Sequence, residues 1–188
     1  MSHRYHPHDA DTRLGRILGM QVSLARGFAL GTVIVLVSYW IVGIALFHRR
    51  PGNALLGAFM LALLHWFSEL VHNYGHFIAA QRTGFPMEGV SLGTREGMII
   101  FGTSVYPDSE QEVSARVHIR RALGGPAANI GAGLLGLVAA LVLSVLGSHF
   151  TWVAVVFAAE NLLVFGVGNA LPLGFNDGST VLRWARHR

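Results

Sequence analysis

The sequence predicts an all-α membrane protein with about four transmembrane helices and a cytoplasmic β-hairpin between the second and third helices. Three observations predict this class. Hydrophobic residues make up 52% of the chain and charged residues 13%, half of the ~25% charge that is typical of soluble domains. Four apolar segments are each long enough to cross a bilayer. The arginines gather on one side of these segments, as in proteins whose basic loops stay in the cytoplasm.

The predicted membrane core covers residues 27–180. Each span holds about 20 or more largely apolar residues, the length that a helix needs to cross the hydrocarbon core. The four spans cover residues 27–47, 54–80, 122–147 and 150–171. We expect residues 1–26 to form a loose N-terminal tail, in which residues 14–24 could form an interfacial helix, and residues 181–188 to form a C-terminal tail.

The distribution of arginine predicts the orientation. With four spans, both tails and the loop 81–121 share one side, which carries twelve arginines, whereas the other side carries Arg49 and Arg50. Arginine-rich short loops stay in the cytoplasm, so we expect both termini there, in the cell membrane of a bacterium or archaeon. The arginines flank apolar segments instead of forming a basic stripe, so we expect no nucleic-acid partner. No oligomeric state is predicted. The absence of cysteine excludes disulfides, thiolate metal sites and cysteine nucleophiles.

The loop between the second and third spans predicts a β-hairpin over residues 88–105. Two apolar runs, EGVSLG and GMIIFGTSV, are joined at TREG, and short apolar runs on either side of a turn are typical of a hairpin.

A polar stripe runs along the second span, in HWFSELVHNYGHFIAA at residues 65–80. A helix advances about 100° per residue, so with His72 at zero, His65 lies at about 20°, His76 at about 40° and Glu69 at about 60°. Asn73 falls at the edge of this face, at about 100°. Ionisable groups at membrane depth usually face a protein interior or a water-filled cavity, so the stripe predicts a polar site inside the bundle. For His65 itself we favour a packing role or hydrogen-bonding support over metal ligation.

His72 and His76 have the i, i+4 spacing that brings two side chains together on one helix face. Two imidazoles placed in this way can share a zinc ion, although hydrogen bonds between helices would also satisfy them. A third ligand must come from elsewhere, and the candidates at suitable depth are Glu160 and Asp177. Asp177 follows a helix-breaking run, NALPLGFNDG, and irregular backbone at membrane depth is tolerated where it lines a cavity.

Three motifs give the chain a resemblance to the site-2 protease family of intramembrane zinc metalloproteases. They are HNYGH at residues 72–76, GGPAAN at 124–129 and NALPLGFNDG at 169–178. They occur in the family's order, and the similar region covers about residues 54–180. The resemblance implies a zinc-dependent hydrolysis of peptide bonds in or near transmembrane segments of protein substrates, with membrane lipid around the site. It also fits the hairpin, which would offer an open edge to an unwound substrate by strand addition.

The resemblance also implies roles for particular residues. His72, His76 and Asp177 match the zinc ligands. Asn129 and Asn169 match polar residues that flank the metal and orient substrate or stabilise an oxyanion. The alternative for both asparagines is a role in helix packing, because small residues around them would let helices approach closely.

The chain departs from the family at Asn73, where the HExxH motif has the glutamate that takes a proton from zinc-bound water. An asparagine amide cannot accept that proton, and loss of a positioned base typically costs ~10²–10⁴-fold in rate. We therefore expect weak or no proteolysis. Three explanations stay open: an introduced substitution, a natural pseudoprotease that binds or regulates membrane proteins, or a substitute carboxylate. Glu69 is the candidate substitute base, extra ligand or hydrogen-bond support for His72, and we favour the last role.

One further class stays open at this point. Buried histidines and carboxylates also serve ion pathways, so a proton or metal-ion carrier is an alternative. Four spans without an inverted repeat argue against it.

Overall fold

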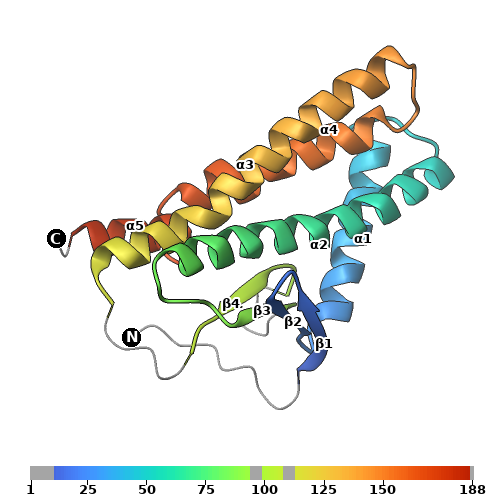
Figure 1. Cartoon of the computed structure of the whole chain (residues 1–188). Coiled ribbons are helices and arrows are strands. Elements are labelled where there is room, and N and C mark those ends of the chain that lie inside the picture. Colours follow the sequence, from blue (N-terminus) through green and yellow to red (C-terminus); the bar gives the residue numbers. More distant parts are fainter. Residues whose placement is uncertain (1–10, 94–98, 108–112, 187–188) are drawn as a thin grey trace.

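The computed structural model describes residues 11–93, 99–107 and 113–186. Within them, four helices are long and apolar enough to cross a membrane (Figure 1). They are α1 (Phe28–Ala45), α2 (Pro51–Arg82), α3 (Ala115–Val145) and a continuous helix made of α4 (Thr151–Ala159) and the π-helical η1 (Glu160–Gly168). A short helix, α5 (Asp177–Ala185), follows the fourth span. The chain is an integral membrane protein, as predicted.

The outer faces of the spans are apolar, which suits contact with lipid chains. Leu63, Leu135 and Val145 are 75%, 72% and 79% exposed in the isolated chain. The long helix α2 begins at Pro51, and proline suits a first helical position because its missing N–H would have no partner there. Within the described residues, the polar side chains that are buried in the spans face the bundle interior instead.

The third helix begins at Ala115 and not at residue 122 as predicted. Its first turns carry Arg116, Arg120 and Arg121. Because these residues are charged, hydropathy does not mark the turns as part of a span. The guanidinium of Arg121 is buried and lies 4.7 Å from the centre of the Tyr106 ring. The helix therefore extends past its apolar part and is held by protein contacts. In the same way, α5 continues the chain as a helix to Ala185 where we expected a tail from residue 181.

The predicted N-terminal tail is wrong for residues 12–24, which form strands and neither a loose tail nor an interfacial helix. The strand β1 (Thr12–Ile17) pairs antiparallel with β2 (Met20–Leu24). Leu18 and Gly19 make the turn with φ values of 48° and 90°. A non-glycine residue rarely adopts positive φ, so this turn carries no ordinary sequence signal.

These two strands belong to a four-stranded sheet with the order β1-β2-β3-β4. The strand β2 runs parallel to β3 (Gly89–Leu92), and β3 pairs antiparallel with β4 (Gly102–Val105). The last two strands fall within the range predicted for the hairpin, while the whole TREG turn at residues 94–97 lies outside the described residues. The all-α class therefore describes the spans and underestimates the sheet.

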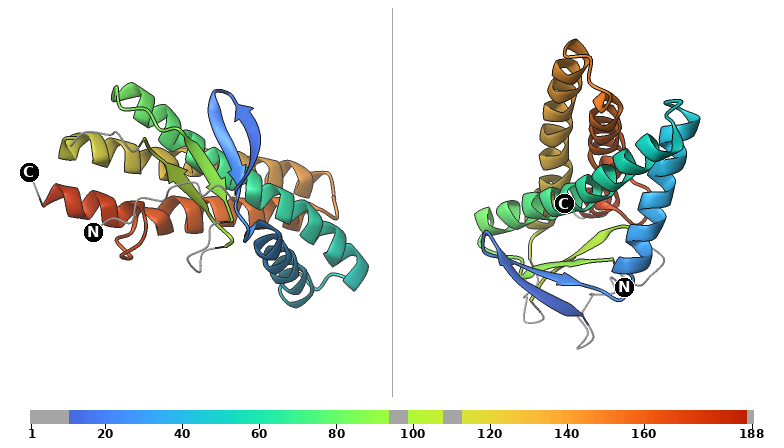
Figure 2. Two further views of the ribbon diagram at one scale, coloured as in Figure 1. Left: turned by 90° about the horizontal axis from the view of Figure 1, so that it is seen from below. Right: turned by 90° about the vertical axis from the view of Figure 1, so that its right-hand side faces the viewer.

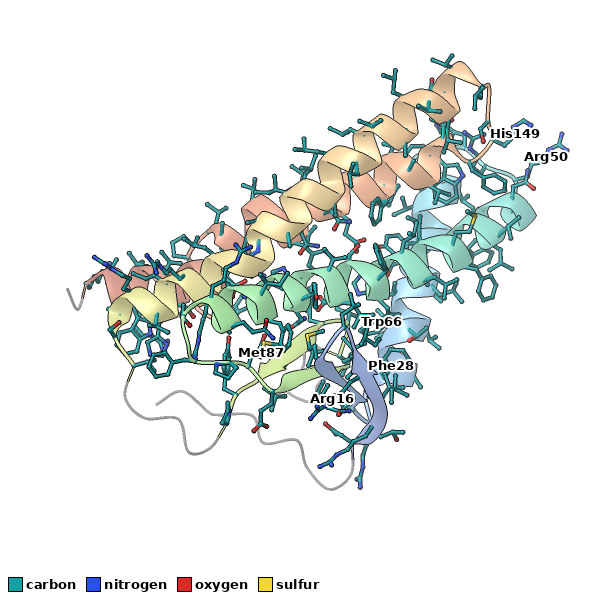
Figure 3. The ribbon with its side chains drawn as sticks, in the orientation of Figure 1. Arg16, Phe28, Arg50, Trp66, Met87 and His149 are labelled. Carbon is teal, nitrogen blue, oxygen red and sulfur yellow. The ribbon has the colours of Figure 1, made fainter. Side chains whose placement is uncertain are left out.

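The sheet lies along one side of α2, and α3 and α4 lie along the other (Figures 1 and 2). Side chains from the sheet and α2 form an apolar core at this junction. Its buried members are Met20, Val22, Trp66, Phe77, Ala80, Met87, Val90 and Leu92. Phe28 of α1 joins this core, with its ring centre 4.6 Å from that of Trp66 (Figure 3). This core fixes the sheet against the half of α2 that carries the polar stripe.

Two glycines bring α2 and α3 into close contact. A Cβ atom built on Gly75 would lie 2.3 Å from the carbonyl oxygen of Gly124, and one built on Gly124 would lie 2.4 Å from the carbonyl oxygen of Gly75. Such separations are far inside van der Waals contact, so only glycine fits at this crossing. Small residues at helix crossings serve this purpose in many membrane proteins. The crossing places the GGPAAN segment directly against the histidines of α2.

Candidate metal centre

Three side chains predicted to hold a metal converge at the crossing of α2 and α3. The Nε2 atoms of His72 and His76 are 3.0 Å apart. The Oδ2 atom of Asp177 lies 3.1 Å from the first nitrogen and 3.3 Å from the second. Ligands placed tetrahedrally at about 2.0–2.1 Å from zinc lie roughly 3.3 Å from one another. The three donor atoms therefore have the spacing of three corners of a tetrahedral zinc site, with the fourth corner left for water or substrate.

The Nδ1 atoms of both histidines are held by oxygen atoms of the protein, which leaves the Nε2 atoms facing the site. The Nδ1 atom of His76 lies 2.7 Å from the carbonyl oxygen of Arg121, and the Nδ1 atom of His72 lies 2.8 Å from Oδ1 of Asn129. Both partners are acceptors, so each Nδ1 carries a proton. The Nε2 atoms are left facing each other and Asp177, and metal-binding histidines commonly have this arrangement.

The backbone of α3 leaves space for an ion beside the two rings. A Cβ atom built on Gly125 would lie 2.5 Å from Nε2 of His72 and 2.5 Å from Nε2 of His76. A methyl group at this position would therefore occupy the space next to both donors. The donor set, the ring protonation and this space together fit a zinc ion.

Asp177 reaches the site from the segment that follows η1. It is the first residue of α5, and the side chain of Asn176 accepts a hydrogen bond from the backbone N–H of Ser179 at the start of that helix. A Cβ atom on Gly178 would lie 2.2 Å from the carbonyl oxygen of Ala170, so this turn packs tightly on the end of the fourth span. Burial tends to raise the pKa of the Asp177 carboxyl, but the His76 and His72 rings outweigh it and lower that pKa to about 2. The carboxylate is therefore ionised, as a metal ligand must be.

Asn169 lies at the rim of the candidate metal centre. Its Nδ2 atom donates to Oδ2 of Asp177 over 3.0 Å and lies 3.0 Å from Nε2 of His72. The amide therefore lies next to two of the three candidate ligands, where its N–H can orient the Asp177 carboxylate.

Asn129 lies behind His72, on the side away from Asp177. It is fully buried, and its Oδ1 atom accepts from Nδ1 of His72. Its Nδ2 atom donates to the carbonyl oxygen of Ser68 over 3.2 Å and to Oδ1 of Asn161 over 2.7 Å. In this geometry the amide holds a ligand ring, whereas the predicted contact with substrate would need the amide on the open side of the metal.

Asn73, at the position of the family's glutamate, connects α2 to the sheet. Its Nδ2 atom donates to the carbonyl oxygen of Glu69 over 2.9 Å, and its Oδ1 atom accepts from Oγ of Ser104 over 2.9 Å. The side chain is 2% exposed. Both of its polar atoms are therefore satisfied by groups of the protein.

Glu69 does not support His72, contrary to the role that we favoured. Its Oε2 atom accepts from the backbone N–H of Gly102 over 2.8 Å and lies 3.4 Å from Nδ2 of Asn73. The partner of His72 is Asn129 instead. Helical side chains point back toward the N-terminus of their helix, which carries the carboxylate of Glu69 away from His72 and toward β4.

Glu160, the other candidate for the third ligand, belongs to a separate cluster. Its Oε1 atom lies 2.6 Å from Nδ1 of His65 and accepts a short hydrogen bond from the Tyr39 hydroxyl. The Nε2 atom of His65 lies 2.6 Å from the carbonyl oxygen of Ile100. This cluster joins α1, α2 and η1 to the residues before β4, in keeping with the supporting role expected for His65.

Sequence reasoning did not single out two buried polar residues near the centre, Ser68 and Asn161. Each is fully buried, and Nδ2 of Asn161 donates to Oγ of Ser68 over 2.9 Å. The available signal was an asparagine in the middle of an apolar span, next to Glu160.

Comparison with solved structures identifies the fold. The chain is similar to the site-2 protease from Methanocaldococcus jannaschii, with a TM-score of 0.58 and 18% sequence identity over 94% of this chain and 71% of that chain. No protein-family model matches the chain, and no curated protein matches it significantly. The architecture is thus that of a site-2 protease, as the three sequence motifs predicted.

Proposed function

We propose that this chain is a site-2-protease-like zinc protein that acts on the transmembrane segments of other membrane proteins, with weak or no peptide hydrolysis because Asn73 replaces the general base. The observation that carries the proposal is the triangle formed by His72, His76 and Asp177, with sides of 3.0, 3.1 and 3.3 Å. The similar fold of a solved site-2 protease supports it. We also propose that both termini face the cytoplasm of a bacterial or archaeal cell.

The residues around the candidate metal centre have different roles. His72, His76 and Asp177 would hold zinc, which when bound supplies Lewis-acid polarisation of a carbonyl group and a lowered pKa for water. Asn169 directs an N–H group to the rim of the site, where it holds the Asp177 carboxylate. Gly125 keeps the space beside both ligand rings open.

Proton transfer is the step that the chain lacks. The amide of Asn73 does not titrate, and its two polar atoms are already bonded to Glu69 and Ser104. Without a positioned base, the expected rate falls by ~10²–10⁴-fold relative to a glutamate enzyme. We therefore expect slow proteolysis, whereas binding of the metal or of a client needs no base and should be unaffected.

The sheet offers a binding edge close to the metal. The strand β4 is one of the two edge strands of the described sheet, and its Ser104 donates a hydrogen bond to Asn73, the residue that follows His72. An unwound segment of a client membrane protein could add to this edge through main-chain hydrogen bonds. The client would therefore meet the metal as an extended strand, with the surrounding lipid restricting access to it.

A second function, that of a pseudoprotease, is favoured by the bonding of Asn73. Both polar atoms of its side chain are bonded to Glu69 and Ser104, so the position of the family's base supplies no group that could take a proton. In this alternative the same fold, with or without metal, binds or regulates membrane proteins.

The two functions separate in a cleavage assay in proteoliposomes with a transmembrane reporter. We would compare the wild-type chain, Glu69→Gln, Asn73→Glu and the double variant Asn73→Glu/Glu69→Gln. His72→Ala is the inactive control, and zinc content is measured for each protein. A glutamate at 73 would lie beside the Glu69 carboxylate, whose Oε2 atom is now 3.4 Å from Nδ2 of Asn73. Repulsion between the carboxylates should limit the single variant, and the double variant should cleave fastest.

The outcomes are distinct. Zinc in the wild-type protein, with cleavage restored only by glutamate at position 73, supports a metalloprotease fold that has lost its base. Fast cleavage by the wild-type chain would reject the pseudoprotease alternative, and its loss in Glu69→Gln would assign the base to Glu69. A wild-type protein purified without chelator that holds no zinc and binds none when titrated would overturn the proposed metal centre.

A further inference from the structure

A chain of hydrogen-bonded, buried polar side chains runs from His72 into the bundle. The inference drawn from it rests on the function proposed above. We infer that Asn161 and Ser68 are positioning residues that fix the tautomer of the metal ligand His72 through Asn129. Ser68, Asn129 and Asn161 are each 0% exposed. They lie on α2, α3 and η1, so their hydrogen bonds connect three of the four spans.

The far end of the chain is fixed by two backbone carbonyl groups. Oγ of Ser68 donates to the carbonyl oxygen of Leu64 over 2.8 Å. Nδ2 of Asn161 donates to the carbonyl oxygen of Phe157 over 2.9 Å and to Oγ of Ser68 over 2.9 Å. A backbone carbonyl can only accept, so the serine hydroxyl must point to Leu64 and the nitrogen of the Asn161 amide must point to Phe157. The oxygen of that amide is then directed toward α3.

At the other end, the orientation of the Asn161 amide determines that of Asn129, which contacts His72. Oδ1 of Asn161 accepts from Nδ2 of Asn129 over 2.7 Å, and the same nitrogen donates to the carbonyl oxygen of Ser68 over 3.2 Å. Both hydrogens of the Asn129 amide are thereby used. Its Oδ1 atom is left facing Nδ1 of His72 at 2.8 Å, and an oxygen in this place requires a proton on Nδ1.

The direction of every bond in the chain therefore follows from three backbone carbonyls. Turning the Asn129 amide around would place its oxygen against the Ser68 carbonyl and the oxygen of Asn161. Turning the Asn161 amide around would place an oxygen against the Phe157 carbonyl. A buried polar atom without a partner is costly, and these fully buried groups have no solvent to replace one. The protein thus keeps the lone pair of His72 on Nε2, the atom that faces His76 and Asp177.

The π-helical turn gives Asn161 its place in this chain. Asn161 is the second residue of η1, where the fourth span changes from α-helical to π-helical hydrogen bonding. Such turns are rare and frequently occur at functional sites. Here the π-helical hydrogen bonding begins at Glu160, one residue before the asparagine that orients Asn129.

The test compares Asn161→Ala and Ser68→Ala with Tyr39→Phe, which removes a buried hydrogen bond in the separate cluster of His65 and Glu160. The first readout is ¹⁵N NMR of metal-free protein with labelled histidine, with the His72 signals assigned by their absence in His72→Ala. The second is the zinc dissociation constant from competition with a chelator. Loss of a group that supports a metal ligand typically weakens metal binding ~10–100-fold.

We expect wild-type protein and Tyr39→Phe to show the Nδ1–H tautomer at His72 and equal zinc affinity. Asn161→Ala should show a mixture of tautomers and zinc binding weakened about 10-fold or more, and Ser68→Ala should show a smaller change in the same direction. Asn129→Asp, whose carboxylate accepts from Nδ1–H in either orientation, should restore the Nδ1–H tautomer in the Asn161→Ala background.

Three results would overturn the inference. They are an Nε2–H tautomer in the wild-type protein, an unchanged tautomer and zinc affinity in folded Asn161→Ala, and an equal loss of zinc affinity in Tyr39→Phe. Because the NMR readout needs no metal, a tautomer change in a protein that binds no zinc would uphold the positioning role and overturn the metal function. If Asn161→Ala does not fold, Ser68→Ala decides on the same two readouts.

Discussion

His65 lies on the same face of α2 as His72 and His76, seven residues before His72. The partners of its ring nitrogens differ from those of the other two histidines. Both nitrogens of His65 meet acceptors, the Glu160 carboxylate and the Ile100 carbonyl, each at 2.6 Å. His72 and His76 each place one nitrogen on an acceptor and turn the other toward Asp177. Position on the helix therefore does not distinguish a ligand from a structural histidine, whereas the partners of the ring nitrogens do.

The His65 cluster and the candidate metal centre have different roles. Both nitrogens of His65 are used in hydrogen bonds to oxygen atoms, and His65 and Glu160 share a proton. The ring therefore has no lone pair for a metal and acts as a cross-link. It ties α2 to η1 and to the residues before β4, and Tyr39 adds α1. Substitutions in the His65 cluster should change stability, and substitutions in the metal centre should change zinc binding.

The largest expected effect is on zinc binding in Gly125→Ala. The added methyl group would lie 2.5 Å from both Nε2 atoms, so neither histidine could approach a shared ion. Binding of zinc by proteins with full ligand sets is worth about 10–16 kcal/mol, and we expect this variant to lose at least about 4 kcal/mol of it, or roughly 1,000-fold in the dissociation constant.

Gly131→Ala is the matched control for that variant, because a Cβ atom at position 131 on the same helix meets nothing within 4 Å. It should bind zinc as the wild-type protein does. Zinc titration with a fluorescent chelator measures both variants. Equal zinc affinity in Gly125→Ala and Gly131→Ala would show that the space beside the histidine rings is not the metal site.

The second effect is on stability in His65→Ala. Removing one partner of a buried ion pair leaves the other charge uncompensated and typically costs about 3–5 kcal/mol. We expect a loss of about 3 kcal/mol in the free energy of unfolding, measured in detergent, with zinc per folded molecule unchanged. Loss of zinc with unchanged stability would erase the distinction between the two histidine groups.

The smallest effect is expected for Tyr39→Phe, which keeps the ring and removes the hydroxyl that donates to Glu160. A hydrogen bond to a charged group contributes about 1.5–3 kcal/mol. The free energy of unfolding should fall by about 1.5 kcal/mol, which is less than for His65→Ala. A larger loss in Tyr39→Phe than in His65→Ala would show that the ion pair is not the main contact of this cluster.

Local patterns explain why much of the fold and site could be predicted from the sequence. Hydropathy over about 20 residues marks a span, and the spacing of His72 and His76 follows from one helical turn. The pairing with Asp177 came from the resemblance of three motifs, because no local pattern brings residue 177 back to residue 72. The irregular segment before α5 brings it there.

What escaped prediction depends on contacts between distant parts of the chain. Residues 21–24 pair in parallel with residues 89–92, and no pattern within residues 12–24 indicates that partner. The roles of Glu69 and Asn161 were also hidden, since each is decided by a group on another element, Gly102 for the first and Asn129 for the second. Polar residues in a span can be found from sequence, but their partners need the packed structure.

The central claim is that two imidazole nitrogens and one carboxylate oxygen hold a single zinc ion at the crossing of α2 and α3. X-ray absorption spectroscopy of the zinc-loaded protein in membranes, beside Asp177→Asn, tests it most directly. We predict one zinc per chain with two imidazole ligands and oxygen at about 2.0–2.2 Å, and a changed or empty site in the variant. A wild-type spectrum without imidazole scattering, or one that Asp177→Asn leaves unaltered, would contradict the claim.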